Sequence, residues 1–584
     1  MPMELYRIQV SDLQERLARK ATAHTAHRFT NLYDLLTWAP LMSWAFDTLM
    51  SNRGSRTAGI DGITRRAAIK QRDHILTDLR AALKARSYQP QPVRRTYILK
   101  ANGKQRPLGI PTLTDRLVQL MVKAILEPIF ESDFLPESHG FRPQRSCHTA
   151  VAHLHQQVAP RHKKMNWTIE GDITGCFDHI QHRVLMRLLR RRIQDQKLLT
   201  VIWQMLRAGV MENKLFSNTT EGTPQGGIAS PLLANIYLHE LDGWMAANYT
   251  RLSRPEKRRR RRDHEGNAFY VRYADDFVIA WNGTKAGAER LKAALAIFLR
   301  EHLGLELSAE KTRITHATAG YDFLGFTVKR RIDPQRKENS LLTYPSTESV
   351  MKLKAKLKSL THSRTTQASV RDKLSVLNRL LRGWANYFRH SAASQTFSYI
   401  GHYAFKRMEI WLRRKTGQRV RAVYRRYYRR HERTMTWSDA GVTLYHPGVS
   451  TRITHQRYAH RPNPYLTGAA QAETTPVTPY PETPPWSGAV YYGEDWTAIR
   501  AAVLERDDHR CQLCGRQRRL EVHHLRKWTP GTAHDPDNLL TLCEPCHAQA
   551  HSPGSETSRK LARRHVRTGE PDEVKVSSPV REGA

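Results

Sequence analysis

The sequence predicts an α+β fold, followed by a basic helical part, a linker and a small terminal module. Three observations lead to this prediction. Short β-like runs alternate with helical stretches over residues 93–335. Helical periodicity then dominates residues 348–433, where apolar side chains recur every three or four positions and acidic residues become scarce. Finally, four of the six cysteines lie within one short C-terminal segment.

Composition limits the class of protein. The chain has 584 residues, with 94 Lys and Arg against 54 Asp and Glu, so its formal net charge is +40. A hydrophobic fraction of 40% is enough to bury real cores, which excludes wholesale disorder. So large a positive surplus favours a polyanionic partner, and nucleic acid is the first candidate. No apolar run is long enough for a membrane span and no signal core begins the chain, so we expect a cytoplasmic, nucleic-acid-associated protein without a membrane partner.

Changes in composition along the chain indicate the domain boundaries. The N-terminal helices form an extension and begin the α+β part, and a Pro- and Thr-rich linker precedes the terminal module. The expected segments are the extension (1–90), the α+β part (91–335), the helical part (336–435), a DNA-binding region with the linker (436–489), the compact module (490–555) and a charged tail (556–584).

The first chemical signal is an acidic pair between two β-rich runs. Tyr273-Ala274-Asp275-Asp276 separates FYVR from FVIAW, so the pair falls at a hairpin turn, and a further carboxylate, Asp172, ends the strand-like WTIEGD. Adjacent carboxylates repel each other, and a divalent cation relieves that repulsion. Three carboxylates from two neighbouring strands could hold two Mg²⁺ ions about 4 Å apart. The four-residue motif alone is better explained as an ordinary turn.

Ordered sequence blocks cover most of residues 55–330. They are TAGIDGIT (57–64), RPLGIPTLTDRLVQ (106–119), HGFRPQRSCHTA (139–150), GDITGCFDHI (171–180), GTPQGGIASPLLANIYL (222–238), VRYADDFVI (271–279), SAEKT (308–312) and DFLGF (322–326). In this order they resemble a reverse transcriptase of the kind encoded by bacterial group II introns. The resemblance implies right-hand polymerase fingers and palm, synthesis of DNA on RNA from dNTPs, and Asp172, Asp275 and Asp276 as the catalytic residues that bind Mg²⁺.

The same resemblance implies a nucleotide-binding set. Lys100 and Arg106 flank a small turn and would clamp the incoming triphosphate; two solvated charges on a hairpin are the alternative. Phe177 matches the aromatic gate that excludes a ribose 2′-hydroxyl, a role compatible with core packing. Gln225 stands before two glycines, where the backbone could approach the nucleotide or template closely. Lys311 would neutralise charge near the triphosphate, although an ion pair with a neighbouring glutamate explains it nearly as well.

Two basic stretches predict contacts with RNA phosphates. Residues 251–262 carry eight cations and one acid, a density that favours counter-ions over a merely solvated face. Residues 406–433 hold twelve Lys or Arg with aromatic rings between them, and these rings could stack on unpaired bases or form a local core. Just upstream, LRGWANYFRHS (381–391) resembles the thumb or maturase segment of the same family, which implies an α-helical thumb that binds intron RNA. The candidate RNA-binding arginines are Arg258, Arg259, Arg260, Arg413, Arg414, Arg425 and Arg426.

The clustered cysteines form two Cys-x-x-Cys motifs. Cys511 and Cys514 are separated from Cys543 and Cys546 by 28 residues, a spacing that suits a tetrahedral Zn²⁺ site. Such a zinc ion usually holds together a module that is too small for its own core.

The residues around these cysteines resemble the ββα-metal fold of HNH endonucleases. The order is His523-His524, then Asn538, then His547 and His551 after the second motif. The resemblance implies His524 as the general base that activates water and Asn538 as a support for its loop. His523, His547 and His551 would bind one divalent metal, for which Mg²⁺ or Mn²⁺ is expected and Zn²⁺ stays open. A zinc ribbon that only binds DNA is the alternative.

Together these resemblances imply a multifunctional group II intron-encoded protein: an RNA-directed DNA polymerase, an intron maturase and a DNA endonuclease that act in target-primed intron mobility. Its expected partners are the intron RNA lariat, target DNA and dNTPs, and its oligomeric state is open, a homodimer included. Two alternatives remain. One is a splicing-only maturase with dispensable enzymatic centres. The other is a non-intron bacterial reverse transcriptase, against which the maturase-like and HNH segments argue.

Overall fold

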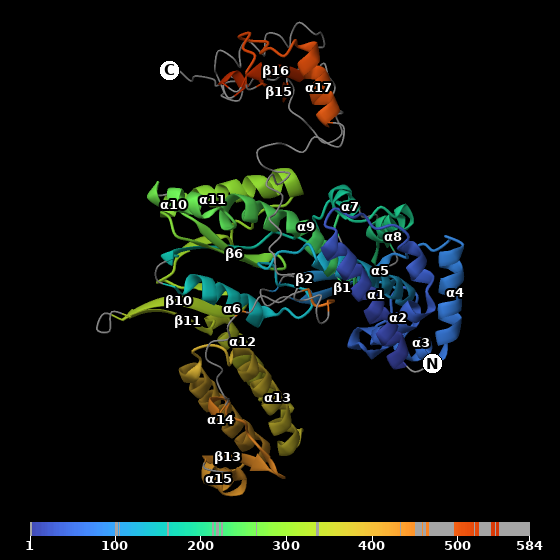
Figure 1. Ribbon diagram of the computed structural model, residues 1–584. Helices are drawn as coiled ribbons and strands as arrows, with labels where there is room; N and C mark the ends of the chain where they lie inside the picture. The colour runs from blue at the N-terminus through green and yellow to red at the C-terminus, as the bar shows by residue number, and fades with distance from the viewer. Residues whose placement is uncertain are drawn as a thin grey trace, which may run out of the picture. The chain divides into compact units, whose positions relative to one another are not determined.

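The computed structural model divides into two compact units, residues 1–480 and 481–584. Figure 1 labels their helices and strands, which confirm the predicted α+β class. The structure describes residues 3–99, 103, 105–160, 163–212, 215–217, 221–222, 226–263, 265–333, 338–431, 434–449, 458, 463–466, 496–518, 520–524, 539–543 and 545–547.

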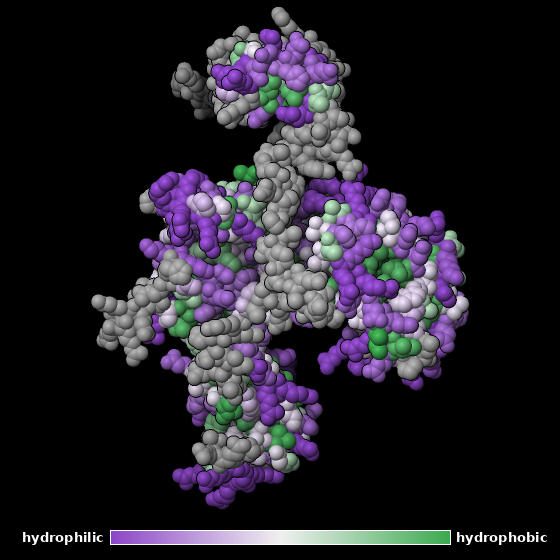
Figure 2. Space-filling model, in the orientation of Figure 1, coloured by the Kyte–Doolittle hydropathy of each residue, from purple (hydrophilic) through white to green (hydrophobic). Residues whose placement is uncertain are grey.

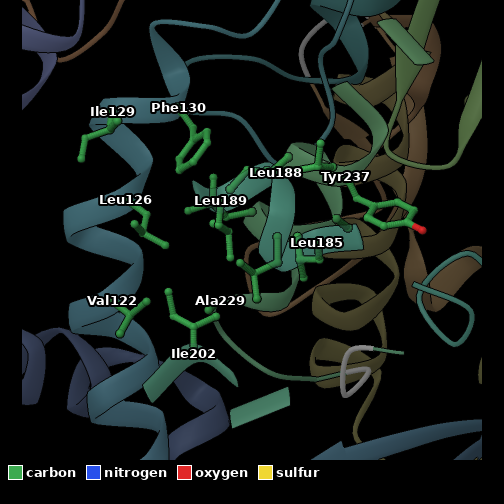
Figure 3. Packing of buried hydrophobic residues seen from close by; sticks show 14 of the residues in the cluster. Val122, Leu126, Ile129, Phe130, Leu185, Leu188, Leu189, Ile202, Ala229 and Tyr237 are labelled. Atoms are coloured by element: carbon green, nitrogen blue, oxygen red, sulfur yellow. The ribbon is translucent and has the colours of Figure 1, made fainter. Parts of the chain in front are cut away.

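The N-terminal part is helical, as predicted. Its helices are α1 (Met3–Ala23), α2 (Ala39–Ser51), α3 (Arg65–Lys70) and α4 (Arg72–Lys84), with 3₁₀ turns at Tyr33–Thr37 and Arg53–Arg56. The helix that organises the core is α5 (Leu113–Glu131), which begins where the Thr112 side chain accepts a hydrogen bond from the Asp115 amide. In Figure 3, Val122, Leu126, Ile129 and Phe130 of α5 lie opposite residues of α7 (His182–Arg190) and α8 (Gln196–Leu206).

A four-stranded antiparallel sheet, the central sheet, carries the acidic motif. Its strands lie in the order β6 (Ala268–Tyr273), β7 (Asp276–Trp281), β3 (Trp167–Gly171) and β8 (Arg313–His316). Both faces are covered, since successive side chains of a strand point to opposite faces. Ile279 joins the core with α9 (Ser230–Met245) and α11 (Lys285–Phe298), whereas Val278 joins a second core with α6 (Cys147–Val158).

A second sheet has the strand order β2-β1-β4-β5. Strands β1 (Val93–Leu99) and β2 (Gln105–Ile110) pair as the hairpin that the sequence predicts around residues 100–106. Strand β4 (Val210–Glu212) runs parallel to β1 and pairs with β5 (Leu215–Ser217).

The helical part follows a three-stranded sheet of order β11-β10-β9. This sheet is formed by β9 (Tyr321–Phe323), β10 (Phe326–Asp333) and β11 (Glu338–Pro345), and the helices after it are α12 (Thr347–Leu360), α13 (Val370–Phe388), α14 (Ser394–Thr416) and α15 (Val420–Tyr427). The helices share a core in which the predicted apolar stripe of α13 is buried. Helical structure ends at Tyr427, earlier than the periodicity to residue 433 predicts. Tyr428 instead pairs with the fully buried Trp437, in a sheet of β12 (Tyr428–His431), β13 (Thr434–Asp439) and β14 (Val442–Thr443).

Part of the predicted linker region packs against the first unit. We call Tyr458 and residues 463–466 the docked segment. The Tyr458 ring stacks on His153 of α6 at 4.0 Å between centroids, and its hydroxyl accepts a hydrogen bond from Arg145 Nη1 at 3.1 Å. The Tyr465 hydroxyl donates to Glu127 Oε2 at 2.7 Å, and Leu466 is buried. The described residues of this region are therefore part of the fold of the first unit.

The second unit is small. Its described elements are α17 (Trp496–Arg506) and the antiparallel pair β15 (Leu520–His524) and β16 (Leu539–Cys543), with two small apolar clusters between them. Within the described parts of both units, none of the helices is long and apolar enough to cross a membrane.

Candidate active sites

The predicted hairpin turn brings the acidic pair to the end of the central sheet. Tyr273 and Asp276 face each other as the last pair of β6 and β7, and Ala274 turns the chain with a φ of 59°. Because β3 pairs with β7 on its other side, Asp172 follows directly after Gly171, the partner of Phe277. Three carboxylates from two neighbouring strands therefore converge at one end of the sheet.

Two glycines lie where neighbouring atoms come very close beside the acidic turn. A Cβ atom at Gly140 would lie 2.3 Å from the Ala274 amide nitrogen. At Gly171, it would lie 2.0 Å from the Phe277 ring. Real Cβ contacts essentially never fall below 3.0 Å, so both positions exclude a side chain. Gly140 was present in a recognised block, but nothing local in the sequence connects it with a turn more than a hundred residues away.

A fully buried ion pair supports the same turn from behind. Arg272 donates from Nε and Nη2 to the two carboxylate oxygens of Asp242, at 2.7 and 2.5 Å. Its Nη1 donates to the Ala274 carbonyl at 2.9 Å, and to Asn235 Oδ1 at 3.1 Å. The Asn235 amide in turn donates to the Gly140 carbonyl at 2.7 Å. Removing one partner of such a pair would leave a buried charge uncompensated, so the network fixes the turn's backbone. Sequence reasoning missed all of it.

The carboxylates form a site of excess negative charge. Burial against the surrounding protein, followed by repulsion from Asp275 and Asp172, raises the pKa of Asp276 to about 7, even though part of its side chain reaches solvent. Lys311 opposes this effect. Its Nζ donates to Asp172 Oδ2 at 2.6 Å, and this hydrogen bond is the main reason that the pKa of Lys311 is raised. Lys311 thus lies with the acidic residues at this end of the sheet. Carboxylate oxygens are the ligands that hard divalent cations such as Mg²⁺ prefer.

The other predicted nucleotide-binding residues are only partly described. Phe177 is half-buried, packs against the main core, and lies edge-on to Phe141 with ring centroids 6.3 Å apart. Arg106 lies in β2 opposite Ile98, but its side chain falls outside the described residues. Lys100 and Gln225 lie entirely outside the described residues.

The candidate RNA-binding arginines lie on three helices. Arg258, Arg259 and Arg260 belong to α10 (Arg254–Arg262), a helix with no buried residue. Exposed arginines also occupy the last turn of α14 and the end of α15; they are Arg413, Arg414, Arg425 and Arg426. The rings between them turn inward. Trp411 and Tyr427 are buried in the core of the helical part, and Tyr424 and Tyr428 pack against it. This surface therefore presents cations to RNA rather than aromatic rings for stacking on bases.

The four clustered cysteines meet in the second unit. One sulfur from each of Cys511, Cys514, Cys543 and Cys546 lies within 4.8 Å of the others, and the Cys514 and Cys543 sulfurs are 3.5 Å apart. Tetrahedral Zn–S bonds of about 2.3 Å would place sulfurs about 3.8 Å apart, so this set fits Zn²⁺. Burial alone would raise the pKa of Cys511, but hydrogen bonds from the backbone amides of Cys543, Leu513 and Cys514 lower it to about 7, which favours the thiolate form that can bind metal.

Two of the predicted nuclease histidines meet beside this cluster. The His523 and His547 rings lie edge-on with centroids 5.1 Å apart, and His547 Nδ1 lies 2.5 Å from Glu521 Oε2. Glu521 stands two residues before His523 on β15, and therefore shares its face of the strand. It is a further site residue that sequence reasoning missed, although period-two spacing could have revealed it. The backbone of His524 continues β15; its side chain, Asn538 and His551 lie outside the described residues.

Comparisons with known proteins agree with this arrangement. The family model "Reverse transcriptase (RNA-dependent DNA polymerase)" matches residues 98–328, "Group II intron, maturase-specific domain" matches 350–430, and "HNH endonuclease" matches 511–552. The chain is 33% identical over 459 residues to the group II intron-encoded protein LtrA of Lactococcus lactis subsp. cremoris, covering 67% of this chain and 75% of that protein. It is also 37% identical over 342 residues to protein YkfC of Escherichia coli, covering 55% of this chain and 89% of that protein.

An antiparallel sheet that presents three carboxylates at one end, inside a reverse transcriptase match, defines a nucleotide-polymerising enzyme. A second enzymatic domain, an HNH endonuclease, follows in the same chain. The chain belongs to the group II intron-encoded proteins: it is a multifunctional reverse transcriptase and maturase with a C-terminal HNH endonuclease.

Proposed function

We propose that Asp172, Asp275 and Asp276 form the polymerase centre, and their convergence at one end of the central sheet is the observation that carries this proposal. They would hold two Mg²⁺ ions, which would activate a primer 3′-hydroxyl and stabilise the leaving pyrophosphate. Lys311, already bonded to Asp172, would turn to a phosphate of the incoming dNTP once the carboxylate is engaged. Lys100, Arg106, Phe177 and Gln225 complete the nucleotide site in this proposal.

The second unit is proposed to cut DNA. The four cysteines would hold a structural Zn²⁺, and His523, His547 and His551 would hold a divalent metal, Mg²⁺ or Mn²⁺, that stabilises charge on the scissile phosphate. His524 would take a proton from the attacking water, because a neutral imidazole titrates near cellular pH. Asn538 would support the loop that carries this base. Glu521 would orient His547 through the contact at its Nδ1.

These activities combine in target-primed intron mobility. The helical part, through its exposed arginines, would bind and stabilise the intron lariat, whose RNA inserts into one DNA strand. The endonuclease would nick the other strand, and the new 3′-hydroxyl would prime reverse transcription of the intron. In this proposal the domains keep the boundaries expected from composition, and the protein acts in the bacterial cytoplasm on intron RNA, target DNA and dNTPs.

Primer extension on an RNA template tests the polymerase assignment. The wild-type chain should make Mg²⁺-dependent cDNA, and Asp275→Asn should reduce it by at least about 100-fold. The same variant should still promote splicing of intron RNA, because the proposed RNA contacts are arginines and the acidic turn repels phosphates. No cDNA from the wild-type chain would instead favour the splicing-only alternative.

Nicking of target DNA tests the endonuclease assignment separately. His524→Ala should abolish nicking and leave primer extension on a pre-primed template unchanged. Nicking at the wild-type rate by this variant would rule out His524 as the base.

A further inference from the structure

The nine residues of α10 separate their charges onto two faces. Ser253 caps this helix by accepting a hydrogen bond from the Glu256 amide, and the acid in the first turn with arginines in the last turn suits the helix dipole. Figure 2 shows strongly hydrophilic residues gathered over α10. Its sequence, RPEKRRRRR, looks almost uniformly basic, but the ion pairs distinguish two faces of the helix.

One face is internally neutralised. Arg259 pairs with Glu256 at 2.8 Å, and with Asp263 and Glu265 at 3.2 Å each. Arg260 pairs with Glu256 at 3.1 Å and lies over the Tyr249 ring at 5.6 Å. Glu256, Arg259, Arg260 and Asp263 are spaced by three, four and seven residues and so share one side of the helix turn. Two of the arginines that the sequence predicted as RNA contacts are thus occupied by acids.

The opposite face carries cations alone. Arg254, Lys257, Arg258 and Arg261 repeat the same three-, four- and seven-residue spacing, and we call them the cationic face. Among the described residues none of these four forms an ion pair with an acid, and the three arginines are exposed. The Arg261 Nε donates only to the Lys257 carbonyl, at 3.2 Å.

The positive potential continues beyond the helix. Burial, then repulsion from Arg261, lowers the pKa of Lys257. Burial, then repulsion from Lys257, lowers the pKa of Lys163, which lies just before β3 and donates to Gln157 Oε1 at 2.6 Å. Arg261, Lys257 and Lys163 thus form a row in which a neighbouring cation repels each of the two lysines, and an external anion would relieve this repulsion.

The cationic face lies away from the polymerase carboxylates. The α10 helix leads into β6. Asn267 stands directly before that strand, and its side-chain amide donates a hydrogen bond to the Lys257 carbonyl of α10. The acidic turn follows the other end of β6, six residues later, a distance of about 20 Å along the strand. In Figure 1, α10 lies at the outer end of the central sheet. An anion bound here is therefore not the primer terminus or the incoming dNTP.

We propose that the cationic face of α10, extended by Lys163, docks the phosphate backbone of folded intron RNA outside the polymerase centre. This inference rests on the proposed function, because intron RNA is the polyanion that the maturase keeps bound. A protein partner fits poorly, since α10 offers no exposed apolar or aromatic anchor. A membrane fits poorly for the same reason, because interfacial helices need an apolar face.

Two matched double variants of the full-length chain test the proposal. Arg258→Gln/Arg261→Gln removes two charges from the cationic face, and Arg259→Gln/Arg260→Gln removes two from the neutralised face of the same helix. The probe is an in vitro transcribed group II intron, bound over about 50 to 200 mM KCl. The first variant should weaken binding about tenfold at low salt and reduce the slope of log K against log salt by about 2. The second should keep the parent slope, and its thermal unfolding midpoint should fall slightly because the ion pairs of Arg259 and Arg260 are lost.

A further pair of measurements separates docking from other roles. Arg258→Lys/Arg261→Lys should retain the parent slope, because a phosphate accepts either cation. Extension of a short primed RNA template by the parent chain reports on the polymerase centre alone, so failure of the parent to make cDNA would refute the proposed function without altering the salt comparison. An unchanged slope for Arg258→Gln/Arg261→Gln would overturn the proposal. So would a loss confined to short DNA duplexes, which would identify DNA as the occupant.

Discussion

At the scale of single residues, the position of the acidic turn depends on a glycine, which has no side chain to obstruct it. Gly140 leaves room for the Ala274 amide, and Arg272 holds the Ala274 carbonyl from the other side. The turn is thus held between two contacts to its backbone. The positions of its carboxylates therefore depend on Gly140 and Arg272, which are not part of the proposed metal site.

Gly140→Ala should therefore impair polymerisation more than it impairs folding. The new methyl group would meet backbone atoms at 2.3 to 3.0 Å, so the turn must shift. A shift on the order of 1 Å at a reacting centre costs about 100-fold in rate. The measurement is primer extension beside thermal melting. Gly54→Ala is the matched control, because its Cβ would meet nothing within 4 Å; equal losses in both variants would contradict the account.

Asp276→Asn should stabilise the metal-free protein while it abolishes cDNA synthesis. The raised pKa of Asp276 means that folding disfavours its ionised form, so stability is lost as pH rises from the ordinary value of 3.8 towards about 7. Asparagine carries no charge and removes that loss. After allowance for solvent screening the gain is roughly 1 kcal/mol. Thermal melting in EDTA should show a larger gain at pH 8 than at pH 5.5, and a gain independent of pH would contradict the cause.

At the scale of elements, strands with local signals were predictable and long-range partners were not. The β6–β7 hairpin follows from a polar pair between two β-rich runs, and the structure has it where expected. The helical periodicity predicts that the helix continues beyond α15, but Tyr428 pairs with Trp437 in a β-sheet. The residues next to Tyr428 in the sequence carry no signal of this pairing. Arg272 and Asp242 are thirty positions apart in the sequence, so only the packing of α9 on the sheet reveals their pairing.

The docked segment should contribute measurable stability to the first unit. Tyr465→Phe removes the donor to Glu127, whose pKa is already raised chiefly by burial, and should cost about 1 to 2 kcal/mol. Hydrogen exchange is the suitable measurement. The Leu466 amide, which donates to the Asn463 carbonyl, should exchange faster in the variant. Amides of β6 and β7 should keep their protection; unchanged exchange at Leu466 would show that the segment is held by other contacts.

At the scale of the whole molecule, the two units have separate cores and should respond separately to damage. Cys543 is buried among the other three cysteines, so Cys543→Ser should remove one ligand of the proposed Zn²⁺ site and unfold the second unit at a lower temperature. Calorimetry should show that transition alone moving. Primer extension should persist and nicking should be lost, and a parallel loss of cDNA synthesis would contradict independent units.

The sequence identified which chemistry each unit carries, because motif order and cysteine spacing are linear features. The supporting contacts of each site were hidden, since Gly140, Asp242 and Glu521 act through neighbours that only folding brings close. The α10 helix shows the same limit on a smaller scale: five consecutive arginines look alike in sequence, and only their ion pairs distinguish them.

The docked segment also has a consequence for the order of events during translation. Asn463 bonds Ser132 across 331 positions of sequence. A ribosome adds about 5 to 20 residues each second, so roughly 17 to 66 s pass between synthesis of the two. During that interval the surface around His153 and Glu127 is made but uncovered. A nascent chain of this protein completes its first unit only after the helical part has emerged, and a transcript truncated before residue 458 would release a polymerase with that surface permanently open.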